Sequence, residues 1–129
     1  MSHAGADGVA LINTLLGMVI DTNSMLPKLA QKTGGLSGPA IRPVAVRAVY
    51  QVHAALPHLP ILGMGGITSG RDAFEFILAG AHAVSVGTAT FGNPTAVIKV
   101  KQELEEILIE KGFNSLNEAI GFAHREVLP

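Results

Sequence analysis

The chain has 129 residues, of which 48% are hydrophobic and 15% charged, and its formal net charge is −1. This composition suits one compact domain, argues against disorder, and gives no electrostatic case for binding nucleic acid or an anionic membrane surface. Cysteine is absent, which excludes disulfides, thiolate nucleophiles and cysteine-bound metal. Because no apolar run reaches the roughly 18 residues of a membrane span and no signal-peptide layout is present, we expect a soluble cytoplasmic protein.

The first predicted strand is the short apolar run from Gly8 to Ile12, which ends at the polar pair Asn13 and Thr14. A long connection follows at residues 15–38, with an apolar segment at 18–20 that we expect to be extended. Connections of this length inside a compact domain are usually functional, so we expect this one to lie over the functional face. Asp21 within it is interpreted as a turn residue rather than as an acid or base.

The middle of the chain predicts a helix, a strand and a second helix. The helix covers Pro39 to Leu56, where apolar residues recur at helical spacing, and the strand covers Ile61 to Met64. Ser69 followed three residues later by Asp72 is typical of a helix start. We expect that helix to present Phe74, Ile77 and Leu78 to the core, with Gly80 at its end.

A third strand is predicted from Ala83 to Val86, directly before Gly87 and Thr88. Asn93 and Pro94 are expected to open the longest helix, with the exposed pair Lys101 and Glu105 on its surface. Its predicted buried stripe is Val97, Val100, Leu104, Ile107 and Leu108. Ser115 and Glu118 have capping-box spacing for a short final helix.

Strands therefore alternate with helices, which predicts an α/β fold with parallel strands covered on both faces. All three strands end in small or polar residues, and ligands of parallel α/β folds bind at those ends. Glycine lets backbone N–H groups approach phosphate oxygens closely. The pairs Gly65–Gly66 and Gly87–Thr88 lie at matching strand ends, so together they favour a phosphate site over two simple tight turns.

Other chemistry is weakly supported. Residues 63–68 lack the third glycine of a dinucleotide-binding fingerprint, and no P-loop is present. Ser85 alternates within a buried strand, which argues against a nucleophile, and Asp7 is interpreted as a turn residue. The histidines show no metal-ligand spacing; His53 and His58 are expected to be solvated, and His82 to be structural. The remaining two histidines are His3 and His124.

Four segments in order resemble the C-terminal part of class 1 dihydroorotate dehydrogenases, most closely the NAD-dependent subclass 1B. The resemblance runs from Ala4 to about His124 and is more specific in combination than in any one motif. The segments are Leu11-Ile12-Asn13-Thr14-Leu15-Leu16-Gly17-Met18, Gly34-Gly35-Leu36-Ser37-Gly38-Pro39-Ala40-Ile41-Arg42-Pro43, Gly63-Met64-Gly65-Gly66-Ile67 and Gly87-Thr88-Ala89.

The resemblance implies a partial (β/α)8 barrel, residues 1–129 supplying strands six to eight with their helices. It implies FMN as cofactor and oxidation of dihydroorotate to orotate in pyrimidine biosynthesis. The substrate-contacting positions would be Asn13 and Thr14. The FMN-contacting positions would be Ile12 and Gly38, together with the phosphate grip of Gly65, Gly66, Gly87 and Thr88.

The same resemblance implies that part of the enzyme lies elsewhere. The family's general base is a cysteine in the first half of the barrel, and its flavin-contacting lysine is also upstream. A full barrel needs about 250 residues. We therefore expect no dehydrogenase activity from this chain, no catalytic residue within it, and self-association or a missing barrel portion at its open sheet edges. The resemblance also implies an electron-transfer subunit with FAD and an iron–sulfur cluster. The alternatives are another FMN or sugar-phosphate barrel, or a non-catalytic structural fragment.

Overall fold

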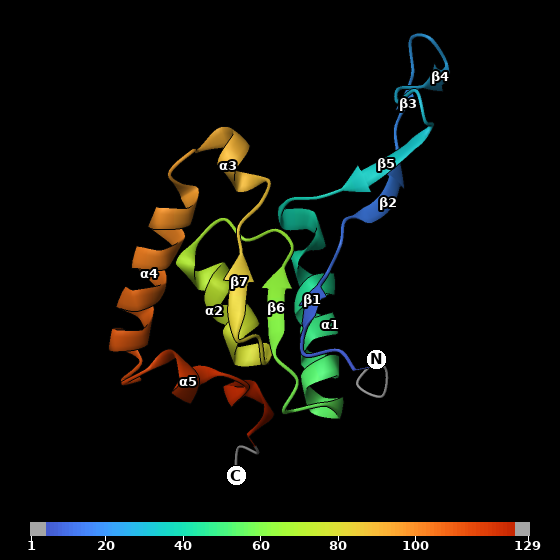
Figure 1. The fold of residues 1–129 in the computed structure, drawn as a ribbon. Helices are drawn as coiled ribbons and strands as arrows, with labels where there is room; N and C mark the ends of the chain where they lie inside the picture. The colour runs from blue at the N-terminus through green and yellow to red at the C-terminus, as the bar shows by residue number, and fades with distance from the viewer. Residues whose placement is uncertain (1–4, 126–129) are drawn as a thin grey trace.

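A computed structural model describes residues 5–125 and contains a central sheet of three parallel strands (Figure 1). The strands are β1 (Val9–Leu11), β6 (Ile61–Met64) and β7 (Ala83–Ser85), in the order β1–β6–β7. Ala10 pairs with Leu62, and Leu62 pairs with Ala83, so the strands are in register. All three predicted strands are confirmed, and β6 has the predicted bounds. Among the described residues, β1 and β7 each have one strand partner.

Helices connect these strands and continue to the C-terminal end. A 3-10 turn (Pro39–Ile41) leads into α1 (Arg42–Ala55), which precedes β6, and α2 (Gly70–Ala79) connects β6 to β7. Two short helices and one long helix then follow, ending in a 3-10 turn: α3 (Ala89–Gly92), α4 (Ala96–Glu110), α5 (Leu116–Ala119) and Phe122–His124.

The bounds of α2 follow from its end residues, as the sequence predicts. The Ser69 side chain accepts a hydrogen bond from the Asp72 N–H, and the Asp72 side chain accepts one from the Ser69 N–H, which completes a capping box. Gly80 ends the helix with φ 117°, a left-handed conformation that favours glycine.

The core lies between the sheet and the helices that cover one of its faces (Figure 1). Its largest fully buried side chains are Phe76, Ile61, Ile77 and Val49. Of the predicted core face of α2, Ile77 is buried and Phe74 is partly buried, and the fully buried Phe76 was not predicted. The other face of the sheet is open in the described residues, where Leu62 is 37% exposed. The predicted coverage of both faces is therefore not seen in residues 5–125.

The longest helix begins later than predicted. Thr95 is the N-cap of α4, and the Asn93 side-chain oxygen accepts hydrogen bonds from the N–H and hydroxyl of Thr95. The helix starts two residues later than expected. Val100 of the predicted stripe is buried, and Leu104 and Leu108 pack against the core. Val97 is 52% exposed, contrary to the prediction, and Ala96 is buried instead.

Two smaller predictions near the C-terminal end have different outcomes. The predicted surface pair Lys101–Glu105 is present, with 3.5 Å between the Lys101 Nζ and a Glu105 carboxylate oxygen. The short helix α5 is also present, but Ser115 makes no side-chain capping bond. Instead, the Glu118 carboxylate accepts a hydrogen bond from the Asn114 N–H at 2.9 Å. A carboxylate near the start of a helix can accept a hydrogen bond from a free backbone N–H group there.

Residues 15–36 form two antiparallel strand pairs, named here the β-arm. β2 (Leu15–Met18) pairs with β5 (Thr33–Leu36), and β3 (Ile20–Asp21) pairs with β4 (Leu26–Pro27). The β-arm extends away from the sheet at the end where α3 lies (Figure 1). The Asp21 carboxylate accepts hydrogen bonds from the N–H groups at 23 and 24, which confirms its interpretation as a turn residue and lowers its pKa.

Many large apolar side chains of the β-arm are exposed to solvent. The most exposed are Leu16 at 82% and Met25 at 81%. The complete set is Leu16, Met18, Val19, Ile20, Met25, Leu26, Leu29 and Leu36.

Within residues 5–125, no helix is long and apolar enough to cross a membrane.

Candidate functional site

The carboxyl ends of β1, β6 and β7 surround a hollow of about 340 Å³. Each of the three strand-end loops contributes to it, as does the segment just before α1. All eight residues that the sequence analysis selected for ligand contact line this hollow: Ile12, Asn13, Thr14, Gly38, Gly65, Gly66, Gly87 and Thr88. The structure therefore brings the whole predicted set together.

The loop after β6 requires its two glycines because of its own conformation and packing. Gly65 has φ 132° and Gly66 has φ 76°, a region that favours glycine. A Cβ at Gly66 would lie 2.5 Å from the carbonyl oxygen of Gly38, and a Cβ at Gly65 would lie 2.9 Å from Ala45 Cβ. These glycines let the loop pack directly on the start of α1, so their presence alone does not indicate a ligand.

Gly87, in the loop after β7, is different. Its φ lies outside the left-handed region, and a Cβ at this position would meet no atom within 4 Å. Neither backbone conformation nor packing within the described residues therefore requires glycine here. A Cβ there would lie in open space, and both Gly87 and Thr88 line the hollow. Absence of a side chain at this point suits close approach of a ligand to the backbone.

A second hollow of about 240 Å³ shares four residues with the first: Gly38, Gly66, Gly87 and Thr88. No lysine, arginine, aspartate or glutamate within residues 5–125 lines either hollow. Among the described residues, the backbone N–H groups of Gly66 and Thr88 donate to no other protein group. A neutral hollow with free backbone donors can hold an anionic group such as phosphate without a cationic side chain.

Asn13 and Thr14 extend the hollow from the end of β1. The Asn13 side-chain oxygen accepts a hydrogen bond from the Thr14 N–H at 2.7 Å, which fixes the orientation of the amide. Its NH₂ group remains able to donate to a ligand. On the opposite side, the Thr88 hydroxyl donates to the Ser37 hydroxyl oxygen at 2.8 Å, linking the loop after β7 to the segment before α1.

Sequence reasoning missed several residues of the hollow. Ser37 lies next to Gly38 in the segment from Gly34 to Pro43, so its place in the hollow could have been predicted from that of Gly38. Ser85 was judged only as a nucleophile, but alternation along β7 turns it toward the hollow, and Met64 occupies the paired position on β6. In the part of the chain that the structure describes, no His, Asp, Glu, Lys or Cys side chain lines either hollow. The described lining can bind and orient a ligand but offers no ordinary group for proton transfer.

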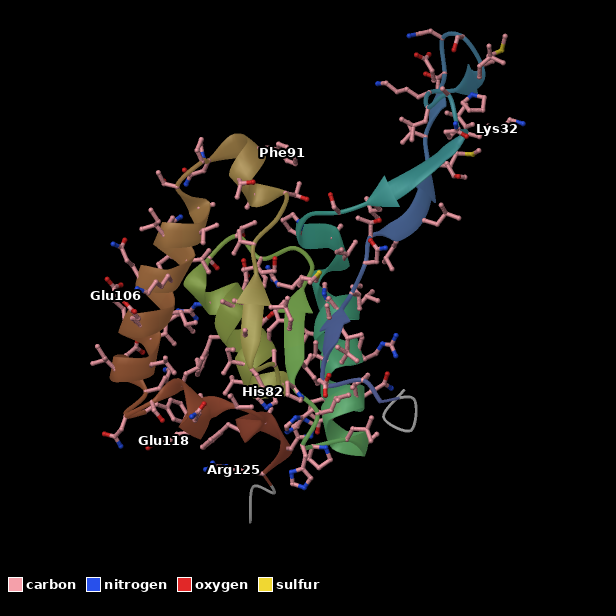
Figure 2. The ribbon with its side chains drawn as sticks, in the orientation of Figure 1. Lys32, His82, Phe91, Glu106, Glu118 and Arg125 are labelled. Atoms are coloured by element: carbon pink, nitrogen blue, oxygen red, sulfur yellow. The ribbon has the colours of Figure 1, made fainter. Side chains whose placement is uncertain are left out.

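The histidines are not part of this site. His53, His82 and His124 gather at the opposite end of the sheet, where Figure 2 labels His82. Contrary to the prediction for His53, its Nδ1 is buried and has no hydrogen-bond partner. His58 is exposed, as predicted, and His3 lies outside the described residues.

Comparison with known proteins identifies the family. The sequence profile of the family described as dihydroorotate dehydrogenase matches residues 1–108. The chain belongs to the dihydroorotate dehydrogenase family. The chain is 58% identical over 121 residues to the dihydroorotate dehydrogenase B (NAD(+)) catalytic subunit of Desulforamulus reducens, and 58% identical over 122 residues to that of Desulforudis audaxviator. The recognition made from the four sequence motifs is confirmed.

These matches cover 94% and 95% of this chain but only 40% and 39% of the relatives, so the chain spans about two fifths of their length. A crystal structure of Eimeria tenella DHODH in complex with ferulenol has the same arrangement, with a TM-score of 0.80 and 32% sequence identity. The similarity covers 97% of this chain and 33% of that one. The predicted fold class, part of a dihydroorotate dehydrogenase barrel, is confirmed.

Proposed function

We propose that this chain is the FMN-binding part of a dihydroorotate dehydrogenase whose complete form oxidises dihydroorotate to orotate in pyrimidine biosynthesis. The observation that carries the proposal is Gly87, which lines the hollow although neither its φ nor any atom within 4 Å of a Cβ there requires glycine. Family membership supports a flavin as the ligand, and the neutral, donor-lined hollow supports binding of its phosphate.

The FMN phosphate is proposed to bind at the loops after β6 and β7. Gly66 and Thr88 offer backbone N–H groups. The absence of side chains at Gly65 and Gly66 lets the loop after β6 pack closely, and its absence at Gly87 leaves room for the phosphate. Several backbone donors that converge on one dianion act together without a counter-charge. Thr88 adds a hydroxyl, which its bond to Ser37 holds at the rim.

The flavin ring and the substrate are proposed to occupy the part of the hollow nearer β1. Ile12 and Gly38 provide apolar and backbone surface beside the ring. Asn13 and Thr14 provide an amide and a hydroxyl that can pair with the polar groups of dihydroorotate or orotate. The β-arm, which begins directly after Thr14, is proposed to lie over this functional face in the complete enzyme.

Comparing FMN with riboflavin tests the phosphate grip. We expect the chain to bind FMN more tightly than riboflavin, which lacks the phosphate, in a titration followed by flavin fluorescence. Gly87→Val should weaken FMN binding without lowering the melting temperature, because its side chain would enter open space. Ala55→Val, an exposed change at the end of α1, is the matched control. Equal affinity for both flavins, or no binding of either, would refute the proposed grip and favour a structural fragment.

The proposed role is binding without catalysis. The sequence has no cysteine for the general base that the family uses, and no acidic or basic side chain of the described residues lines the hollows. Removing a proton from dihydroorotate requires a positioned base. We expect no dihydroorotate-dependent flavin reduction by this chain under anaerobic conditions, and measurable reduction would contradict this part of the proposal.

Partners are proposed at the uncovered surfaces of the chain. The edges of β1 and β7, the open face around Leu62 and the β-arm would be covered by the remaining barrel or by self-association. The relatives are named catalytic subunits of an NAD(+)-dependent enzyme. We therefore also propose a separate electron-transfer subunit with FAD and an iron–sulfur cluster, in a cytoplasmic enzyme.

A further inference from the structure

Asp72 is the one charged side chain classed as buried among residues 5–125, at 8% exposure. It occupies the third position of α2, where a capping box requires only its bond to the Ser69 N–H. Burying a carboxylate is costly unless hydrogen bonds and opposite charge compensate for the lost water. The hydrogen-bond partners of the Asp72 carboxylate therefore indicate which other segments this residue holds in place.

One oxygen of this carboxylate holds the loop that follows β6. Asp72 Oδ2 accepts hydrogen bonds from the Thr68 N–H at 2.9 Å, the Thr68 hydroxyl at 2.8 Å and the Ser69 N–H at 3.0 Å. Thr68 lies two residues after Gly66 and lines the smaller hollow. Asp72 thus fixes the loop that forms one wall of the ligand site.

The other oxygen holds α1. Asp72 Oδ1 accepts a hydrogen bond from Arg42 Nη1 at 2.5 Å, and Arg42 Nε lies 3.1 Å from the Glu75 carboxylate. Arg42 is the first residue of α1 and follows the 3-10 turn that begins at Pro39. Gly38 and Pro39 form the wall of the hollow that faces the loop after β6.

The two walls touch at Gly66, where even a methyl group would collide with Gly38 and Pro39. The two walls are therefore in direct contact at this point. The Asp72 carboxylate connects them through its bonds to Arg42 on one side and to Thr68 and Ser69 on the other. Neither Arg42 nor Asp72 lines either of the two hollows at the strand ends, so the pair acts on the ligand site through the backbone.

We propose that Arg42 and Asp72 are positioning residues, whose ion pair holds the Gly66–Thr68 loop against Gly38 and Pro39 in the geometry that accepts the flavin phosphate. The inference rests on the proposed function, since it concerns how tightly that phosphate is held. A buried ion pair adds little net stability compared with apolar packing. Its hydrogen bonds nevertheless fix the start of α1 relative to the loop after β6.

The electrostatics of Asp72 agree with a charged clamp. Burial acts to raise the pKa of its carboxyl, but the hydrogen bonds from Thr68 and Ser69 and the charge of Arg42 hold the pKa below its usual value. The carboxylate is therefore ionised at neutral pH and can keep both partners.

Binding by three variants tests the proposal. Asp72→Asn removes the charge but keeps the size, and Arg42→Gln removes the ion pair from the more exposed side. Each should weaken FMN binding by about tenfold or more while changing riboflavin binding by less than about twofold. Glu75→Gln is the matched control, because it removes the half-exposed partner of Arg42 and leaves the bond to Asp72. Hydrogen exchange of the Thr68 and Ser69 amides should accelerate in Arg42→Gln but not in Glu75→Gln.

The outcomes separate this inference from the proposed function. If the unmodified chain binds FMN no better than riboflavin, the proposed function is wrong and the inference is overturned with it. If it prefers FMN but Arg42→Gln keeps that preference and the slow exchange, only the positioning role is wrong. Equal weakening of both flavins together with a lower melting temperature would also overturn it, since a purely structural role predicts that pattern. Should Asp72→Asn not fold, Arg42→Gln decides the question.

Discussion

The Tyr50 ring of α1 stacks on the His124 imidazole, with 3.8 Å between ring centroids and 14° between the ring planes. His124 Nε2 also lies 3.0 Å from the carbonyl oxygen of Ala79, to which a protonated Nε2 donates. These contacts attach the C-terminal 3-10 turn to α1 and α2. His53 lies beside the stack, 4.9 Å from His124 and 6.4 Å from His82 between ring centroids.

We predict that this histidine cluster makes stability depend on pH. Burial lowers the pKa of His53, and the charges of His124 and His82 lower it further. The unfolded chain then binds a proton at His53 more readily than the folded chain does. Stability is therefore complete above the ordinary histidine pKa of about 6.5 and is lost as the pH falls from there toward the lower folded value.

Melting temperatures measured between pH 7.5 and 5.5 check this prediction. The unmodified chain should melt at a lower temperature at the acidic end, and His53→Gln should reduce that dependence because glutamine does not titrate. His58→Gln, on the exposed segment after α1, should keep the full dependence. Identical pH profiles for the unmodified chain and His53→Gln would show that His53 is not responsible.

The two phenylalanines at the extremes of burial give a test of the core. Phe76→Ala should destabilise the chain by about 3–5 kcal/mol, since Phe76 is fully buried between the sheet and the helices. Phe91→Ala should change the stability by less than about 0.5 kcal/mol, because Phe91 is 90% exposed on α3 (Figure 2). Urea denaturation of both variants measures the difference, and similar midpoints would contradict the described packing.

A third prediction concerns the glycine contact between the two walls of the site. Gly66→Ala should cost about 1–3 kcal/mol of stability, because alanine disfavours φ 76° and its methyl group would collide with Gly38. Gly87→Ala should leave the stability unchanged, since its methyl group meets nothing within 4 Å. Thermal melts compare the two, and a stable Gly66→Ala variant would mean that the walls are not in contact.

The exposed apolar surface of the β-arm predicts concentration-dependent association of the isolated chain. Replacing Leu16 and Met25 by serine should reduce the mass measured by light scattering at a given concentration, because both side chains are more than four-fifths exposed. The matched control replaces Val97 and Ile98, which are exposed on α4, and should leave the mass unchanged. An unmodified chain that is monomeric at high concentration would rule out this association.

Sequence periodicity was sufficient for the sheet and for most helix positions. The strand at 61–64 has its predicted bounds because a short apolar run between Pro60 and Gly65 leaves little alternative. Ser69 and Gly80 set the ends of α2 by local hydrogen bonding and backbone conformation, which sequence displays directly. The start of α4 was misplaced because Asn93 and Pro94 form a preceding turn, in which Asn93 caps Thr95 by side-chain bonds.

Tertiary contacts account for what the sequence could not show. His53 is far from His82 and His124 in the chain, so no local pattern indicated that its Nδ1 would be buried. The pairing of Arg42 with Asp72 across 30 residues was equally invisible, although both lie in recognisable helix starts. The pairs Gly65–Gly66 and Gly87–Thr88 were predicted from their place at strand ends, which follows general rules in parallel folds. Ile12, Asn13, Thr14 and Gly38 were predicted only from the resemblance to the family.

The hollow is lined by segments that are far apart in the chain, so binding of a ligand there depends on complete folding. Residues 12–14, 37–38, 64–66 and 85–88 must meet to form it, so no single hairpin or helix contains a partial copy. The hollow exists only after all three strands have assembled with α1, which requires contacts of long sequence separation. A flavin bound there would therefore recognise the folded chain alone and would raise its melting temperature with each increase in flavin concentration.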